Sequence, residues 1–455
     1  MTTKHLPDKP APLWRVYMMF LGPMILSNIL QGLSGTLNGI FIGQMLGTHA
    51  LASVAGMFPI VFFFVSLVIG LGAGSSVLVG QAWGARDPAK VRAITGAALA
   101  LGALIGLAAA VLGALFAREA MMALGTPADV LEDALRYARV MMLTMPFLLV
   151  FILFTQLLRG VSDTVSPLLA LMISTAVGLV LTPALIQGWL GLPRLGILSA
   201  AVASLLATLA AMAFLAVRLR RLGHVMAPDR AFLAAFRLDR AILGKVLRIG
   251  LPTSVQMVII SVSELVILAL VNQHGSQATA AYGAVTQVVN YVQFPALSIA
   301  ITASILAAQA IGAGATERLG AILRTGLWLN VAITGGFVLL GYALSHALLG
   351  LFLTDEAVRV QGEHLLHIML WSLLVFGFQA VLGGIMRASG DVLVPTGITI
   401  FCILVVQMGV AWVLNCSMGL EGIWIAFPVA YLAMLALQTT YFRVVWRHRK
   451  IERLV

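Results

Sequence analysis

One carboxylate stands out because it lies inside a segment of the sequence that is otherwise apolar. Glu264 falls between Ile249 and Asn272, in a stretch long enough to cross a bilayer as a helix. An ionised carboxylate in the bilayer core is costly unless it faces a cavity or a partner. We therefore expect Glu264 to bind and release a proton or a cation. The alternative is a permanently protonated carboxyl group that hydrogen-bonds a neighbouring helix.

Amide and hydroxyl side chains accompany this carboxylate at helical spacing. Gln256 and Ser261 lie near the face of the helix that carries Glu264. The next apolar segment adds a stripe of amides at intervals of three residues, which are Gln287, Asn290 and Gln293. These side chains predict one polar pocket, although interhelical hydrogen bonding is an alternative for the stripe. The predicted ion-coupling residues are Glu264, Gln256, Ser261, Gln287 and Asn290.

Aromatic and amide side chains elsewhere in the apolar segments are candidates for contact with a substrate. Large, adaptable side chains suit the binding of varied amphipathic compounds. Packing against lipid or in the protein core is the alternative for the aromatic members. The predicted substrate-cavity residues are Asn38, Phe58, Phe62, Tyr282, Gln293 and Gln379.

Two further patterns favour ordinary structural roles. Glu363, His364 and His367 have a spacing that suits a metal, but they fall at an outer helix end, so we expect surface or packing residues and no metal site. Gly70-x-Gly72-x-Gly74 lies in an apolar span without a strand, so it is not a nucleotide fingerprint. Small residues there permit close helix contact. We expect no cofactor other than the proton or cation that Glu264 would bind.

The composition requires that membrane-spanning helices position these side chains. Hydrophobic residues make up 61% of the chain, charged residues 10%, and the mean hydropathy is +1.03. Soluble domains carry about 25% charged residues. The long charge-free runs predict an all-α integral membrane protein with twelve transmembrane helices. An enzyme is not expected, because the spans contain no cluster of His, Asp and Glu residues.

The distribution of basic residues predicts the topology. Most of the 28 Lys and Arg residues fall in segments that are on the inside if the N-terminus is cytoplasmic. The sequence therefore predicts a multi-pass protein of a bacterial-type inner (plasma) membrane with both termini in the cytoplasm. The net charge of +11 does not require a nucleic-acid partner. We interpret the basic stretch 218–248 as a topogenic linker that touches anionic lipid.

The two halves of the chain repeat one another. A shift of 228 residues aligns Gly47 with Gly275, Gln81 with Gln309, Arg159 with Arg387 and Asp163 with Asp391, and a shift of 229 aligns Pro23 with Pro252. Six spans per half give two parallel repeats, a plan that transporters use with a binding site between the halves. The predicted division is an N-terminal tail 1–14, an N-lobe 15–221, a basic linker 222–243, a C-lobe 244–446 and a C-terminal tail 447–455.

The repeated segments also carry a family resemblance. The resemblance rests on three segments of the first half, 43–52 (GQMLGTHALA), 80–87 (GQAWGARD) and Arg159-Gly160, and on their counterparts in the second half, 274–278, 308–314 and 387–391. Through these segments the chain resembles the multidrug and toxic compound extrusion (MATE) family over residues 15–445. The resemblance implies a V-shaped, two-lobed transporter that exports organic, often cationic or amphipathic drugs by antiport with H⁺ or Na⁺. It implies drug-like small molecules and membrane lipids as partners, and we expect a monomer.

The sequence departs from the better-known family pattern at several positions. Asn38 stands where many members have an Asp, and Thr182 stands in a stretch that often carries an Asp. The sequence therefore predicts that the N-lobe lacks the cation site of those members. Phe376 replaces an Asp of one branch of the family, and Glu264 lies about one helical turn from that branch's Glu. These differences place the expected chemistry in the second half.

Other classes of function remain as alternatives. A lipid-linked oligosaccharide flippase, or another lipid flippase of the wider superfamily, would typically need cationic residues in its cavity, and the sequence has no Lys or Arg in the middle of a span. A channel or a receptor would not need a parallel duplication with a matched set of motifs. The leading hypothesis is a secondary active multidrug exporter.

Overall fold

The computed structural model describes residues 12–123, 131–229, 232, 235–353 and 355–455. These residues are helical, turn or irregular, with no strand among them. Twelve helices in this part of the chain are long and apolar enough to cross a membrane. The predicted all-α fold with twelve spans is therefore confirmed. Helices dominate because only internal hydrogen bonding can satisfy a backbone that lies in lipid.

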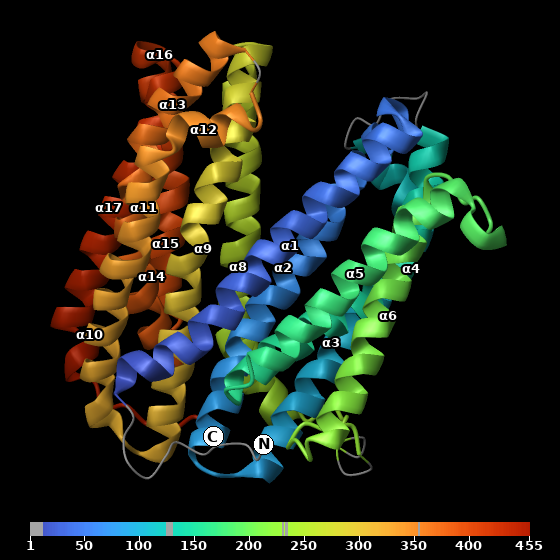
Figure 1. Ribbon diagram of the computed structural model, residues 1–455. Helices are drawn as coiled ribbons and strands as arrows, with labels where there is room; N and C mark the ends of the chain where they lie inside the picture. The colour runs from blue at the N-terminus through green and yellow to red at the C-terminus, as the bar shows by residue number, and fades with distance from the viewer. Residues whose placement is uncertain (1–11, 124–130, 230–231, 233–234, 354) are drawn as a thin grey trace. The chain divides into compact units, whose positions relative to one another are not determined.

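The first six spans are single helices (Figure 1). They are α1 (Leu13–Leu46), α2 (Thr48–Gly84), α3 (Pro88–Ala123), α4 (Leu131–Gly160), α5 (Val165–Gln187) and α6 (Leu198–Arg221). A short 3₁₀ turn, η1 (Trp189–Gly191), precedes α6.

The last six spans are more often interrupted. Two are the continuous helices α8 (Arg240–Asn272) and α9 (Ser276–Ala313), and α17 (Leu420–Val444) ends in the 3₁₀ turn η5 (Trp446–His448). The others are built from the segments η2 (Thr316–Arg318), α10 (Leu319–Leu329), η3 (Asn330–Thr334), α11 (Gly335–Ala343), α13 (Glu356–Leu370), α14 (Ser372–Ala388), α15 (Leu393–Phe401), η4 (Cys402–Gln407) and α16 (Met408–Met418), with α12 (Ser345–Gly350) between α11 and α13. The segments η3 and η4 are π-helical turns within their spans.

The repeat is visible in the turn that follows the first span of each half. Gly47 joins α1 to α2 with φ of +88°, and Gly275 joins α8 to α9 with φ of +94°. A side chain disfavours this region of backbone conformation, whereas glycine enters it freely. The matched glycines of the sequence therefore have the same local role in both halves.

The chain forms two compact units that exchange the ends of three helices. Unit 1 comprises residues 26–79 and 87–254 of the described chain, and unit 2 comprises residues 12–25, 80–86 and 255–455. The start of α1 and the end of α2 therefore belong to unit 2, and the first half of α8 belongs to unit 1. The compact units thus differ from the lobes 15–221 and 244–446 at these three ends, and the lobe boundaries stay a prediction.

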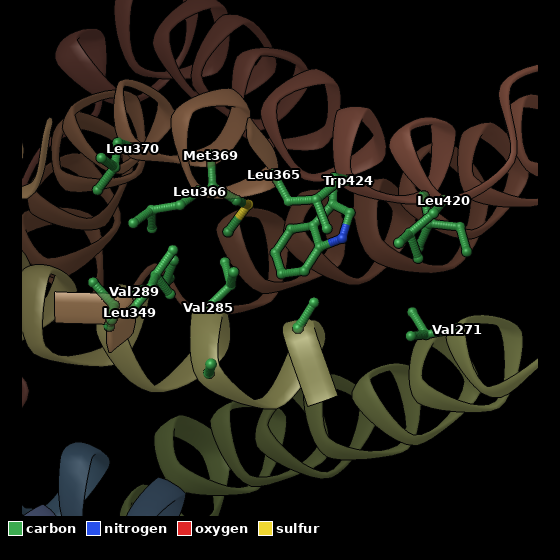
Figure 2. Close-up of a cluster of buried hydrophobic side chains, with 14 of the residues drawn as sticks. Val271, Val285, Val289, Leu349, Leu365, Leu366, Met369, Leu370, Leu420 and Trp424 are labelled. Carbon is green, nitrogen blue, oxygen red and sulfur yellow. The ribbon is translucent and has the colours of Figure 1, made fainter. Parts of the chain in front are cut away.

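Each unit has its own apolar core. In unit 1, buried side chains of α3, α4 and α6 pack together with Ile42 of α1 and Met57 of α2. In unit 2, the core joins α8, α9, α13 and α17, and Figure 2 shows Val285 and Val289 of α9 facing Leu365, Leu366 and Trp424. Trp424 is only 1% exposed. This second core fixes the helices that carry the predicted polar residues.

The glycine pattern of the second span permits close helix contact, as the sequence predicted. Within unit 1, a Cβ at Gly74 would lie 2.6 Å from the backbone nitrogen of Gly250, and a Cβ at Gly70 would collide with Ser254. The hydroxyl group of Ser254 donates to the carbonyl oxygen of Leu67 at 2.6 Å. Small residues thus allow α2 to approach the first half of α8.

Candidate ion-coupling and substrate site

The helix α8 is anchored by packing on both sides of Glu264. Ile259 and Ile260 contact a small core formed by η4 and α17, whose buried members include Ile403. Ile267, nearly one turn after Glu264, is fully buried in the main core of unit 2. The side chain of Glu264 itself is exposed. Apolar contacts thus hold the helix, while the carboxylate remains accessible.

Two tyrosines lie within electrostatic range of this carboxylate. Glu264 interacts electrostatically with Tyr282 of α9 and with Tyr431 of α17. Within the described part of the chain, Glu264 has no ion pair and no hydrogen bond. Three helices of unit 2 therefore bring one carboxylate and two phenols within electrostatic range of one another. This arrangement can hold a proton or a monovalent cation.

Aromatic packing fixes the two tyrosines. The ring of Tyr282 lies 5.4 Å from that of Trp424, and the ring of Tyr431 lies 5.3 Å from that of Phe376. Trp424 in turn stands in the core shown in Figure 2. The hydroxyl groups are consequently held by rings that cannot move freely.

The other predicted ion-coupling residues lie on the same two helices. Gln256 and Gln287 are half-buried, and Asn290 is exposed. In the residues that the structure describes, none of these three amides forms a side-chain hydrogen bond. Ser261 donates to the carbonyl oxygen of Met257 on its own helix at 2.8 Å. The amides are therefore available to a ligand and are not interhelical links, but whether they join Glu264 in one site stays a prediction.

The candidates for the substrate cavity fall into different environments. Phe58 and Phe62 stack on one face of α2 with ring centroids 5.9 Å apart, and they are 67% and 37% exposed. Gln293 is half-buried on α9. Gln379 of α14 is only 7% exposed, so protein atoms cover it in this conformation. The assignment of these residues to a cavity remains a prediction.

Two positions of the first half at which the sequence departs from the family pattern meet in unit 1. The hydroxyl group of Thr182 on α5 donates to Oδ1 of Asn38 on α1 at 3.1 Å. A neutral pair thus stands where a carboxylate was expected from the resemblance. The arrangement is consistent with a first half that lacks an acidic cation site of its own.

The two histidines beside Glu363 differ in their partners: His367 lies 3.9 Å from the carboxylate of Glu363, whereas His364 pairs with another carboxylate. His364 pairs with Glu421 at 3.2 Å, whereas Glu363 accepts a 2.6 Å hydrogen bond from Ser345. His367 contacts the same serine at 3.1 Å. Among the described residues, no group of three His, Cys, Asp or Glu side chains is arranged to hold a metal ion.

Sequence reasoning did not single out Tyr431. Gly196 and Ile197 align with Gly422 and Ile423 at a shift of 226 residues, so the counterpart of Tyr431 in the first half is Leu205; the counterpart of Tyr282 is Val54. A search of the repeat for positions that are polar in one half and apolar in the other would have found both tyrosines. Their approach to Glu264 depends on contacts between distant helices, which the linear sequence does not display.

Known proteins resemble this chain over nearly its whole length. The MatE family model matches residues 23–184 and again residues 252–413, so the predicted repeat is confirmed. The chain is 40% identical over 450 residues to a probable multidrug resistance protein, YoeA, of Bacillus subtilis, covering 98% of this chain and 97% of that protein. It is 24% identical over 431 residues to the multidrug export protein MepA of Staphylococcus aureus, covering 94% and 93%.

Solved structures share the fold. One is a mutant of the Vibrio cholerae MATE transporter VcmN, with a TM-score of 0.88, 18% identity and coverage of 96% of this chain and 98% of that chain. Another is a multidrug resistance MATE family transporter in an outward-facing conformation, with a TM-score of 0.87, 22% identity and coverage of 97% and 98%. The likeness extends over nearly the whole of each chain.

Proposed function

The chain belongs to the MATE family, and from this premise we propose that it exports drug-like organic compounds by antiport with H⁺ or Na⁺. Two relatives that it matches over most of their length are named for multidrug resistance and multidrug export. The observation that carries the coupling assignment is Glu264. It is a carboxylate inside a predicted span, without an ion pair among the described residues and within electrostatic range of two phenol groups.

The proposed mechanism is competition for one negative charge. A coupling ion that occupies Glu264 neutralises it, and loss of that ion leaves a carboxylate that attracts an organic cation. Because each ligand lowers the affinity for the other, an ion gradient drives drug movement in the opposite direction. The rings of Tyr282 and Phe427, which lie beside Trp424, supply apolar and cation–π contact for an aromatic or amphipathic cation.

Transport in proteoliposomes tests this proposal. With an imposed pH or Na⁺ gradient, wild-type protein is expected to move a fluorescent organic cation. The gradient-driven rate of Glu264→Gln is expected to be at least about tenfold lower than that of wild type. Glu421→Gln is the matched control, because Glu421 is an exposed carboxylate on the same unit that pairs with His364. Equal transport by Glu264→Gln and wild type under both gradients would exclude the coupling role.

The same preparation separates drug export from the flippase alternative. If the protein translocates a labelled lipid-linked sugar and does not move the organic cation, the drug-export proposal is wrong. Preference for the pH gradient or the Na⁺ gradient identifies the coupling ion.

A further inference from the structure

The C-terminal residues are docked onto the ends of three helices of unit 2. The main-chain N–H of Leu454 donates to Oε1 of Gln81, at the end of α2, at 2.8 Å. The Nε2 atom of the same Gln81 donates to the carbonyl oxygen of Ala388, at the end of α14, at 2.8 Å. Gln81 is fully buried. One buried amide thus connects the C-terminal segment, α2 and α14.

The orientation of this amide is fixed by its two partners. A main-chain N–H requires an acceptor and a carbonyl oxygen requires a donor, so only one placement of the oxygen and the nitrogen satisfies both. A buried amide that lost either partner would leave an unsatisfied polar group, which is costly. Gln81 therefore favours the docked position of Leu454 specifically.

Glycines make room for the side chains of the docked segment. A Cβ at Gly390 would lie 2.9 Å from Cδ2 of Leu454, and a Cβ at Gly314, just after α9, would lie 2.7 Å from Nη2 of Arg453. Gly390 has φ of +84°, a conformation that few other residues adopt. The receiving surface thus consists of the ends of α2, α9 and α14, shaped to accept residues 453 and 454.

Polar contacts secure the start of the segment. Arg449 pairs with Asp391 at 3.2 Å, and the hydroxyl group of Tyr441 donates to the same carboxylate at 2.6 Å. The indole N–H of Trp446 donates to Ser389 at 2.9 Å. The chain from Trp446 to Leu454 is therefore held at both ends by the turn that follows α14.

The first half also has a segment that docks after its last span. Met226, five residues after the end of α6, is fully buried in unit 1. There the guanidinium of Arg92 donates to the carbonyl oxygen of Val225 at 2.9 Å, and Phe232 packs on Phe154. In both halves, the segment after the last span thus folds back and packs onto its own unit, as a disordered tail would not.

We propose that residues 449–455 form a strap that fixes the Gly84 end of α2 within unit 2, and that this end is released when the strap undocks. The helix α2 is the relevant element because its body belongs to unit 1 while its last residues, Gly80 onward, belong to unit 2. A segment that binds those last residues controls whether they stay with unit 2. The occupant of the receiving surface is the chain's own segment 449–455.

Hydrogen–deuterium exchange of the full-length protein in detergent tests the strap without reference to any substrate. Leu454→Pro removes the N–H donor to Gln81, whereas Leu454→Ala keeps the donor and is the matched control. We expect Leu454→Pro to accelerate exchange of the amides in residues 80–86 about fivefold, with a smaller change in Leu454→Ala. A chain that ends at Lys450 provides the same test without the conformational effect of proline.

A synthetic peptide of residues 451–455 completes the experiment. Added to the truncated chain, it is expected to restore slow exchange in residues 80–86. The proposal is overturned if truncation leaves exchange of residues 80–86 at the wild-type rate.

Discussion

At the scale of single residues, the site depends on one charge and the phenols beside it. Glu264 has Thr36 as its counterpart in the first half, just as Tyr282 and Tyr431 have Val54 and Leu205. The duplication therefore preserved turns and packing but not polar chemistry. A lone carboxylate that must alternate between two ligands benefits from neighbours that can donate a hydrogen bond without adding charge.

Removal of a phenol hydroxyl group near Glu264 is expected to weaken coupling without abolishing it. Tyr431→Phe retains the ring that packs on Phe376 and loses only the hydroxyl group. A hydrogen bond that Tyr431 donates to Glu264 at one stage of the transport cycle would contribute about 0.5–1.5 kcal/mol, so gradient-driven transport is expected to fall about two- to tenfold. Tyr342→Phe is the control, since its hydroxyl group donates to the main chain of His367, away from Glu264. Equal effects of the two variants would contradict a role for Tyr431 in coupling.

A buried histidine in the linker makes stability depend on pH. His224 lies 3.9 Å from Asp163, and its Nδ1 accepts from the main-chain N–H of Met226 at 3.1 Å. Burial lowers the pKa of His224, and the carboxylate of Asp163 opposes this only in part. The folded protein therefore favours the neutral ring, and its stabilisation is complete above the ordinary histidine pKa. It is lost as the pH falls from that value through the lowered pKa.

The measurement is the melting temperature in detergent between about pH 7 and pH 5. We expect the wild-type value to fall more steeply than that of His224→Gln, which has no titratable group at this position. Parallel curves for the two proteins would show that His224 does not carry this part of the pH dependence.

At the scale of helices, the two halves use the same pair of spans differently. In the first half, a Cβ at Gly106 of α3 would collide with Pro146 of α4. In the second half, Thr334 on the π-helical turn η3 is the counterpart of Gly106. The glycine at this helix contact is instead Gly377, on the partner helix α14. A Cβ at Gly377 would collide with the side chain of Asn330, which is completely buried and donates to the carbonyl oxygen of Leu374 at 3.0 Å.

A methyl group at Gly377 is therefore expected to be destabilising. Gly377→Ala should cost about 1–3 kcal/mol, because a packed side chain and a buried hydrogen bond must shift. Gly336→Ala on α11 is the matched control, since a Cβ there meets no atom within 4 Å and alanine favours a helix. Thermal unfolding in detergent should show a lower midpoint for the first variant only. Equal midpoints would indicate that η3 can rearrange freely.

At the scale of the whole molecule, charge asymmetry predicts how the twelve spans are oriented in a membrane. Most Lys and Arg residues lie at one set of helix ends and in the linker between α6 and α8. Because basic loops are retained in the cytoplasm, these ends are predicted to be cytoplasmic. The predicted outer loops instead carry acidic residues such as Asp355 and Glu356.

Cysteine labelling in intact bacterial cells checks this orientation. Cys402 is buried and Cys416 is exposed, so Cys416→Ser removes the reactive background. A cysteine in place of Glu356 is expected to react with a membrane-impermeant maleimide from outside. A cysteine in place of Asp239 should react only after permeabilisation. Reaction of the Asp239 position in intact cells would reverse the assigned topology.

The sequence by itself determined the properties that depend on composition and local pattern. It predicted twelve spans, the repeat, close packing at Gly70 and Gly74, and an intramembrane carboxylate at Glu264. Hydropathy, glycine spacing and charge act within a helix or between neighbours in sequence, so their consequences can be predicted from the sequence alone.

Only the tertiary structure decided which distant groups meet. The approach of Tyr282 and Tyr431 to Glu264, the pairing of Thr182 with Asn38, and the docking of Leu454 on Gln81 each join elements far apart in the chain. The exchange of the ends of α1, α2 and α8 between the two units is of the same kind. Such contacts arise from the packing of whole helices, and no periodicity along one helix specifies which partner its face will meet.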